Sequence, residues 1–171
     1  MGLLKAVQSN INSCTPSTKE ALKSHKRFFM DGTFKSCAKQ YKQLYTIHDD
    51  LGSSSTEIKI VPVLFALLCN KSCATYTKLF QIIKEATSWN PHTVSVDFEQ
   101  ATITSLKTIY PTVAIQGCNF HFNQALWQKN QELGLVKAYK KDGATRNHLR
   151  MCAALAYIPI GNIDEDWITI Q

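Results

Sequence analysis

Short runs of apolar and β-branched residues predict five strands along the chain. The first three follow one another closely, at residues 28–35, 43–48 and 60–68. They are rich in aromatic and β-branched side chains, which favour strands, and polar segments separate them. The fourth and fifth strands are shorter, at residues 92–96 and 113–115. Because Pro62 removes a donor from the third strand, that strand belongs at an edge of the sheet or begins there.

After the third strand the apolar period changes from two residues to about 3.6, which predicts helices. The first helix ends at Asn90-Pro91, since proline disfavours helical geometry in the residue before it. Further helices are predicted from Phe98 to Tyr110, from about His121 to Leu133, and in a last segment that ends at Pro159. The apolar stripe of the first helix consists of Tyr76, Leu79, Phe80, Ile83 and Ala86.

Composition places the chain among soluble globular proteins. It has 171 residues, of which 44% are hydrophobic and 19% charged, enough for one domain with a real core. No apolar run is long enough to span a membrane, and no secretory leader precedes the six cysteines, so reduced thiols are expected. The net charge of +6 suits a polyanionic partner. We expect a mobile lead-in over residues 1–26 and one domain over residues 27–171.

Two aspartates stand where buried strand residues are expected. Asp31 lies within Phe28-Phe29-Met30-Asp31-Gly32-Thr33-Phe34, and Asp97 directly follows Val94-Ser95-Val96. An unpaired carboxylate in such a place costs several kcal/mol, whereas two carboxylates brought together from neighbouring strands form a site for a hard cation. The pattern therefore makes Asp31 and Asp97 candidate metal ligands.

The order of the elements predicts the fold class. A meander of three strands, followed by alternating helices and strands, is typical of an α/β ribonuclease H-like mixed sheet with flanking helices. In that arrangement the first strand is central and the fourth lies beside it. Asp31 and Asp97 would then face one pocket near the carboxyl ends of the parallel strands.

Five blocks in order resemble the catalytic domain of Mutator-like element (MULE) transposases, and the resemblance runs from about Phe28 to Trp167. The set is more specific than any one block. The blocks are Asp31-Gly32-Thr33-Phe34-Lys35, Gln43-Leu44-Tyr45-Thr46-Ile47, Val61-Pro62-Val63 through Asn70-Lys71, Asp97-Phe98-Glu99-Gln100-Ala101 and Gly117-Cys118-Asn119-Phe120-His121-Phe122.

The resemblance implies a metal-dependent nuclease that cuts DNA at transposon ends and transfers strands to a target, acting in the nucleus. Asp31 matches the first catalytic acid of the family and Asp97 the second. Cys118 and His121 match the Cys-x-x-His signature between the second and third acids. The family also implies Mg²⁺ or Mn²⁺ as the cofactor and DNA as the partner, and it leaves a homo-oligomer open.

The sequence departs from the family pattern downstream of this signature. A third acid, a glutamate, is expected there, but Glu132 follows the signature too closely and Glu165 lies in an acidic patch at the end of the chain. We therefore expect a domain that is incomplete at its C-terminus, a fragment or a decayed copy, which cuts DNA poorly or not at all. The alternative function is a domesticated DNA-binding or interaction protein without chemistry.

The candidate residues also have simpler interpretations. Asp31 before Gly32 is compatible with a turn, and Asp97 with a cap on the following helix. Glu99 stands close enough to approach the site, although the helix dipole alone explains a glutamate in a first turn. The residue types of a zinc site are present in Cys69, Cys73, Cys118 and His121, but their spacing matches no standard zinc ribbon.

Overall fold

The computed structural model describes residues 16–33 and 37–170. Within this part the chain forms two compact units, residues 1–116 and 117–171, which are described separately below. Residues 1–15 of the expected lead-in lie outside the described residues, as do Phe34 and Lys35 of the first family block. The predicted domain boundary between residues 26 and 27 stays a prediction.

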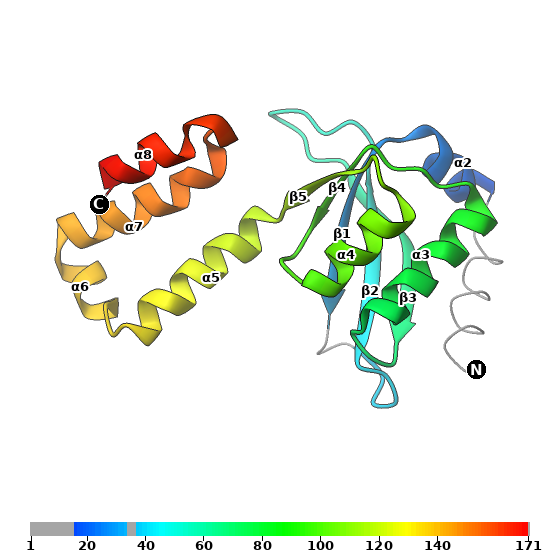
Figure 1. Ribbon diagram of the computed structural model, residues 1–171, viewed down its shortest axis with the longest axis horizontal. Helices are drawn as coiled ribbons and strands as arrows, with labels where there is room; N and C mark the ends of the chain where they lie inside the picture. Colours follow the sequence, from blue (N-terminus) through cyan, green and yellow to red (C-terminus); the bar gives the residue numbers. More distant parts are fainter. Residues whose placement is uncertain (1–15, 34–36, 171) are drawn as a thin grey trace. The chain divides into compact units, whose positions relative to one another are not determined.

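The first unit is a five-stranded mixed sheet with helices packed on it (Figure 1). The strand order is β3-β2-β1-β4-β5. The first three strands pair antiparallel as a meander, and β4 pairs parallel with β1. This confirms that the first strand is central and that the fourth lies beside it. The strands are β1 (Arg27–Thr33), β2 (Gln43–Asp50), β3 (Ile60–Leu68), β4 (Thr93–Val96) and β5 (Ala114–Gly117).

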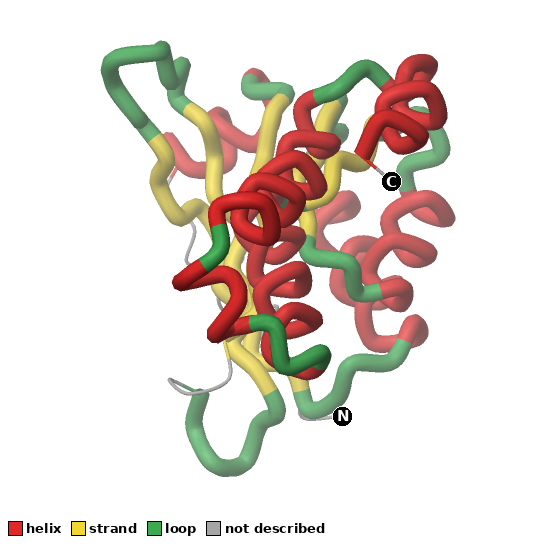
Figure 2. Tube along the Cα trace, turned by 90° about the vertical axis from the view of Figure 1, so that its left-hand side faces the viewer, coloured by secondary structure: helices red, strands yellow, loops and turns green. Residues whose placement is uncertain are grey.

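The edge position predicted for the third strand is confirmed. β3 lies at one end of the strand order, and Pro62 pairs with His48 next to a register shift between Ile47 and His48. The irregular ladder at this point accommodates a residue that has no N–H to donate. Residues 37–42, before β2, and residues 51–59, after it, lie at opposite ends of the sheet (Figures 1 and 2).

Three helices in the described part of the first unit are α2 (Pro16–Ser24), α3 (Cys73–Thr87) and α4 (Gln100–Ile109). Ser72 caps the start of α3 by accepting a hydrogen bond from the Thr75 N–H, and Ser88 ends this helix in a left-handed conformation with φ of 56°. Part of the expected lead-in is therefore helical, and Leu22 of α2 is fully buried in the core.

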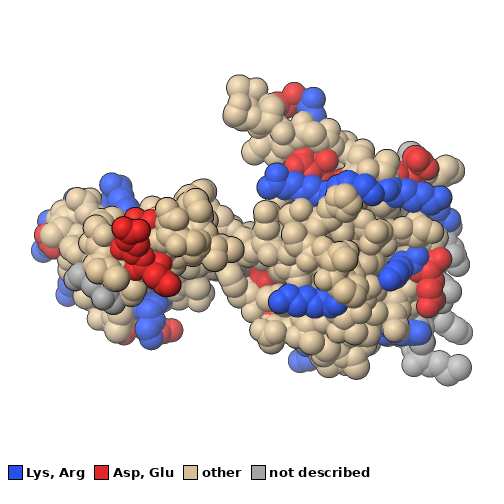
Figure 3. All heavy atoms as spheres, turned by 45° about the horizontal axis from the view of Figure 1, so that its top comes forward, with Lys and Arg blue, Asp and Glu red and all other residues tan. Residues whose placement is uncertain are grey.

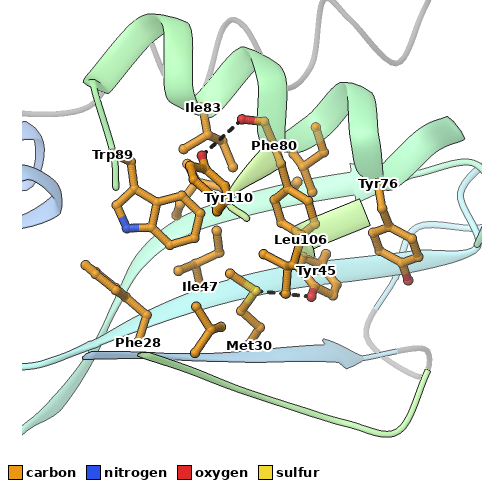
Figure 4. Packing of buried hydrophobic residues seen from close by; sticks show 14 of the residues in the cluster. Phe28, Met30, Tyr45, Ile47, Tyr76, Phe80, Ile83, Trp89, Leu106 and Tyr110 are labelled. Atoms are coloured by element: carbon orange, nitrogen blue, oxygen red, sulfur yellow. Dashed lines mark hydrogen bonds between the residues drawn. The ribbon is translucent and has the colours of Figure 1, made fainter. Parts of the chain in front are cut away.

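The core lies between one face of the sheet and helices α3 and α4 (Figures 1 and 4). Alternate residues of the strands point into it, as the two-residue period of a strand requires. Three aromatic rings meet edge to face: Trp89 lies 5.2 Å from Phe28 and 5.3 Å from Tyr110, measured between ring centroids. The sheet side chains labelled in Figure 4 are Phe28, Met30, Tyr45 and Ile47.

The second unit is helical. The predicted third helix is present, but the predicted last helix ends at Ala154 and continues to Tyr157 only as a short 3-10 turn. Two α-helices were not predicted: α6 is a single short stretch, and the three acids in the first turn of α8, which favour a helix start, were interpreted only as an acidic patch. The elements are α5 (Asn119–Glu132), α6 (Val136–Lys141), α7 (Gly143–Ala154), η1 (Leu155–Tyr157), η2 (Ile160–Asn162) and α8 (Ile163–Ile170).

Candidate functional site

The two strands that carry the candidate acids lie side by side. β1 and β4 pair in parallel with Arg27 opposite Thr93, Phe28 opposite Val94 and Phe29 opposite Ser95. The observed pairs end at Phe29 with Ser95; extended by two residues, the same register would set Asp31 opposite Asp97. Asp31 is inside β1, and Asp97 is the residue after the end of β4.

Burial alternates along both strands and separates the acids from the core. Phe28 and Met30 of β1 are buried, as are Val94 and Val96 of β4. Asp31 and Asp97 occupy the intervening positions of this alternation, and both are half-buried. By the two-residue period they belong to the sheet face turned away from α3 and α4.

The turn interpretation does not describe Asp31, whereas Asp97 does bond a backbone N–H next to the start of α4. Asp31 stands within the ladder opposite Thr46, so it is a strand residue and not part of a turn. Asp97 Oδ1 accepts a hydrogen bond from the Glu99 N–H at 3.2 Å, which forms a tight side-chain turn before α4. The residue at the cap position of α4 is Glu99 itself, whose side chain makes no capping bond.

Glu99 is held by a lysine from another part of the chain. Lys71 Nζ donates to Glu99 Oε2 at 3.1 Å, and the Glu99 side chain is only 19% exposed. The pair links the segment after β3 to the start of α4, next to Asp97. Lys71 thus places a cation beside Glu99, two residues after Asp97.

Two buried phenols lie near this end of the sheet. Burial raises the pKa of Tyr45 well above its usual value, and the carboxylates of Asp97 and Glu99 raise it further. Burial likewise raises the pKa of Tyr76 to about 12. Both phenols therefore stay neutral at physiological pH and keep their protons as hydrogen-bond donors.

Gly32, next to Asp31, lies against a fully buried glutamine of β2. A Cβ at Gly32 would stand 2.6 Å from Gln43 Oε1. Gln43 has little room to move, because it is 0% exposed and its Nε2 donates to Tyr76 Oη at 2.5 Å. The absence of a side chain at Gly32 is thus required by close packing beside the candidate acid.

We expect Gly32→Ala to destabilise the chain by about 1–3 kcal/mol, since an added methyl group must displace a packed, hydrogen-bonded amide. Urea unfolding followed by circular dichroism measures the change. Gly143→Ala is the matched control, because no atom lies within 4 Å of its Cβ position. Equal stability of the two variants would show that Gln43 adjusts without cost.

The signature residues belong to the second unit. Cys118 occupies the cap position of α5, and its carbonyl accepts the Phe122 N–H at 3.0 Å. His121 lies in the first turn of α5, with its ring 5.4 Å from that of Phe120. Both follow β5 directly, whereas Asp31 and Asp97 are part of the first unit.

The candidate acids offer part of the ligand set that a metal ion needs. Two carboxylates on adjacent strands supply oxygen ligands of the kind that Mg²⁺ and Mn²⁺ take. Across residues 16–33 and 37–170, no group of three or more His, Cys, Asp or Glu side chains is arranged to hold an ion. The residues present thus fit a hard divalent cation in part, and Cys69, Cys73, Cys118 and His121 do not gather into a zinc site.

Sequence reasoning missed one hydrogen-bonded pair that includes a buried carboxyl group. Asp49 is fully buried at the end of β2 and accepts a hydrogen bond from His25 Nδ1. Gln43, Tyr45, Ile47 and Asp49 share the two-residue period of the core face, and this pattern was the available signal. The pair lies at the opposite end of β1 from Asp31, so it belongs to the fold of the first unit and not to the candidate site.

Comparison with known proteins agrees with the ordered blocks. No helix in the described part of the chain is both long and apolar enough to cross a membrane. No curated protein matches the sequence. The model of the MULE transposase domain matches residues 28–125, which is more than half of the chain and includes both acids and the Cys118–His121 signature. The chain therefore belongs to the MULE transposase domain family.

Proposed function

We propose that this chain carries the catalytic chemistry of MULE-type DNA transposition, which is metal-dependent phosphodiester cleavage followed by strand transfer. Asp31 and Asp97 are the proposed catalytic acids. The observation that supports the proposal is the parallel pairing of β1 and β4, whose register, extended by two residues, would set the two acids opposite each other. Their half-burial on one sheet face supports the same assignment.

We also infer that the first unit is the core of a ribonuclease H-like fold. The strand order, the antiparallel meander and the parallel partner strand support this inference. Ligands of such open sheets bind near the carboxyl ends of the parallel strands, and both proposed acids are at or near these ends.

The proposed role of each acid follows from its surroundings. A divalent Mg²⁺ or Mn²⁺ ion would supply the Lewis acidity that activates a nucleophile and stabilises the leaving oxygen. Asp31 would hold this ion from within the rigid ladder of β1. Asp97 would hold it with a carboxylate whose orientation is set by the Glu99 N–H. The neutral phenols of Tyr45 and Tyr76 add no negative charge to the site.

The proposed substrate is DNA at transposon ends and in the target, in the nucleus. Membership of a transposase family supports DNA as the partner. Lys and Arg atoms form a row across the visible face of the first unit (Figure 3), and the whole chain carries a charge of +6. Such charge favours phosphate contacts that do not depend on sequence.

The test is nicking of a supercoiled plasmid by the purified chain in Mn²⁺. We expect slow nicking, because two carboxylates alone position a nucleophile poorly. The Asp31→Asn, Asp97→Asn double variant controls for contaminating nuclease and should not nick. Equal nicking by the native chain and the double variant would contradict the assignment. No nicking by a chain that binds both Mn²⁺ and DNA would favour the alternative, a DNA-binding protein without chemistry.

A further inference from the structure

A pocket of about 180 Å³ lies within the second unit, between α5, α6 and α7. Its lining combines two aromatic rings, an arginine and a carboxamide with aliphatic side chains. A cavity of about 150 Å³ accommodates a benzene ring, so this pocket has room for one flat heterocycle. The residues that line it include Asn123, Leu126, Trp127, Tyr139, Leu149 and Arg150.

The aromatic pair provides a stacking surface. Trp127 and Tyr139 meet edge to face, with ring centroids 5.2 Å apart and planes at 74°. Such a contact covers only one face of one ring, and Trp127 remains 38% exposed. The indole is therefore fixed by its neighbour and still has surface that a ligand ring can cover.

Basic side chains surround the pocket on α6 and α7. Residues 136–154 contain five Lys and Arg against one acid, Asp142, so this segment carries +4 of the net charge of +6. Asp142 caps the start of α7, where its carboxylate accepts hydrogen bonds from the N–H groups of Ala144 and Thr145. The positive charge of the segment thus has little internal compensation. The five basic residues are Lys137, Lys140, Lys141, Arg146 and Arg150.

Two of these cations share a helix face with the pocket. Arg146 and Arg150 are four residues apart on α7, so their side chains lie on the same side of that helix, and Arg150 lines the pocket. In the described part of the chain, no carboxylate lies within ion-pair distance of Arg150. Arg150 is exposed and therefore accessible to an anion.

We propose that this pocket binds one unpaired nucleobase of a DNA single strand, with the adjacent phosphates on Arg150 and Arg146. Stacking on an aromatic ring inside a positively charged groove is how proteins bind single strands. Asn123 donates its amide hydrogens to Asn119, which leaves its carbonyl oxygen as an acceptor for a base edge. A base within a duplex is already stacked on both sides, so only an unpaired base can enter.

The test is fluorescence anisotropy of a labelled single-stranded oligonucleotide with the full chain in EDTA. The absence of metal separates this site from the proposed metal site, because failure of one does not affect the other. We expect tighter binding of the oligonucleotide than of an abasic strand of the same length. Equal affinity for the two strands would overturn the proposal without any change to the protein.

Protein variants identify the residues that bind. Trp127→Ala should weaken binding of the normal strand roughly 5- to 150-fold, the usual range for loss of one stacked base. Trp127→Phe, which keeps a ring, should retain most of the affinity, and Trp167→Ala is the control because Trp167 does not line the pocket. Arg150→Gln should weaken binding of both strands and reduce the salt dependence. If an acidic peptide displaced the oligonucleotide equally well from the native chain and from Trp127→Ala, the surface would bind through charge alone and not through base stacking.

Discussion

Replacement of Asp97 by asparagine is expected to lower the affinity of the chain for Mn²⁺ at least tenfold. The substitution removes a negative charge without changing the size of the side chain, and the remaining amide oxygen can still accept the Glu99 N–H. The loss should therefore come from metal binding and not from unfolding. Changes in residues that only orient metal ligands cost about 10- to 100-fold, so loss of a ligand should cost no less. Asp31→Asn should have the same effect.

Titration of the chain with Mn²⁺, followed by electron paramagnetic resonance, measures this affinity. Glu132→Gln is the matched control, because Glu132 is exposed and pairs only with Lys129 on the surface of α5. Glu99→Gln asks a separate question, since Glu99 lies close in sequence and is paired with Lys71. A tenfold loss in Glu99→Gln would assign it as a third ligand. Unchanged affinity in both aspartate variants would remove the proposed site.

The second large effect is expected in the core. Trp89→Ala should destabilise the chain by about 3–5 kcal/mol, because a large side chain is removed from a site that cannot collapse around the gap. Trp89 is fully buried, and its ring contacts both Phe28 and Tyr110 edge to face. Natural domains are stable by only about 5–15 kcal/mol, so this single change would remove a large part of the total.

Guanidinium chloride unfolding of the full chain measures this loss. Trp167→Ala provides the control at the same residue type, because Trp167 is 43% exposed and its loss should change stability by about 0.5 kcal/mol or less. Trp89→Phe should fall between the two, since it retains part of the ring contacts. Equal stability of the two alanine variants would show that the aromatic cluster contributes little to folding.

The sequence predicted the sheet well because its signals are local. The two-residue alternation in β2 follows directly from which face is buried, and the observed strands agree closely with the prediction. The apolar run of β3 also gave the strand, although Ile60, Val61 and Phe65 of this edge strand are exposed. The edge position of β3 followed from Pro62 for the same reason. The helices of the second unit were predicted less well, because α6 spans only six residues and gives no clear period.

The candidate acids illustrate a different limit. Local pattern alone allowed Asp31 to be interpreted as a turn residue and Asp97 as a helix cap, because aspartate is common in both places. The ordered family blocks selected the acids, and the parallel pairing of β1 with β4 supports their being neighbours. Lys71 and Glu99 are 28 positions apart in the sequence, and Gln43 and Tyr76 are 33 positions apart. No local pattern therefore indicates these contacts.

By itself, the sequence determined the mixed α/β class, the order of the strands along the chain and the two candidate acids. Apolar alternation, proline and glycine at element ends, and the order of motifs are all properties of neighbouring residues. Only the tertiary structure decided the register in which β1 and β4 pair, why Gly32 has no room for a side chain, and how Trp127, Tyr139 and Arg150 form one pocket. The physical reason is that packing in three dimensions brings together side chains whose separation along the chain carries no trace of their contact.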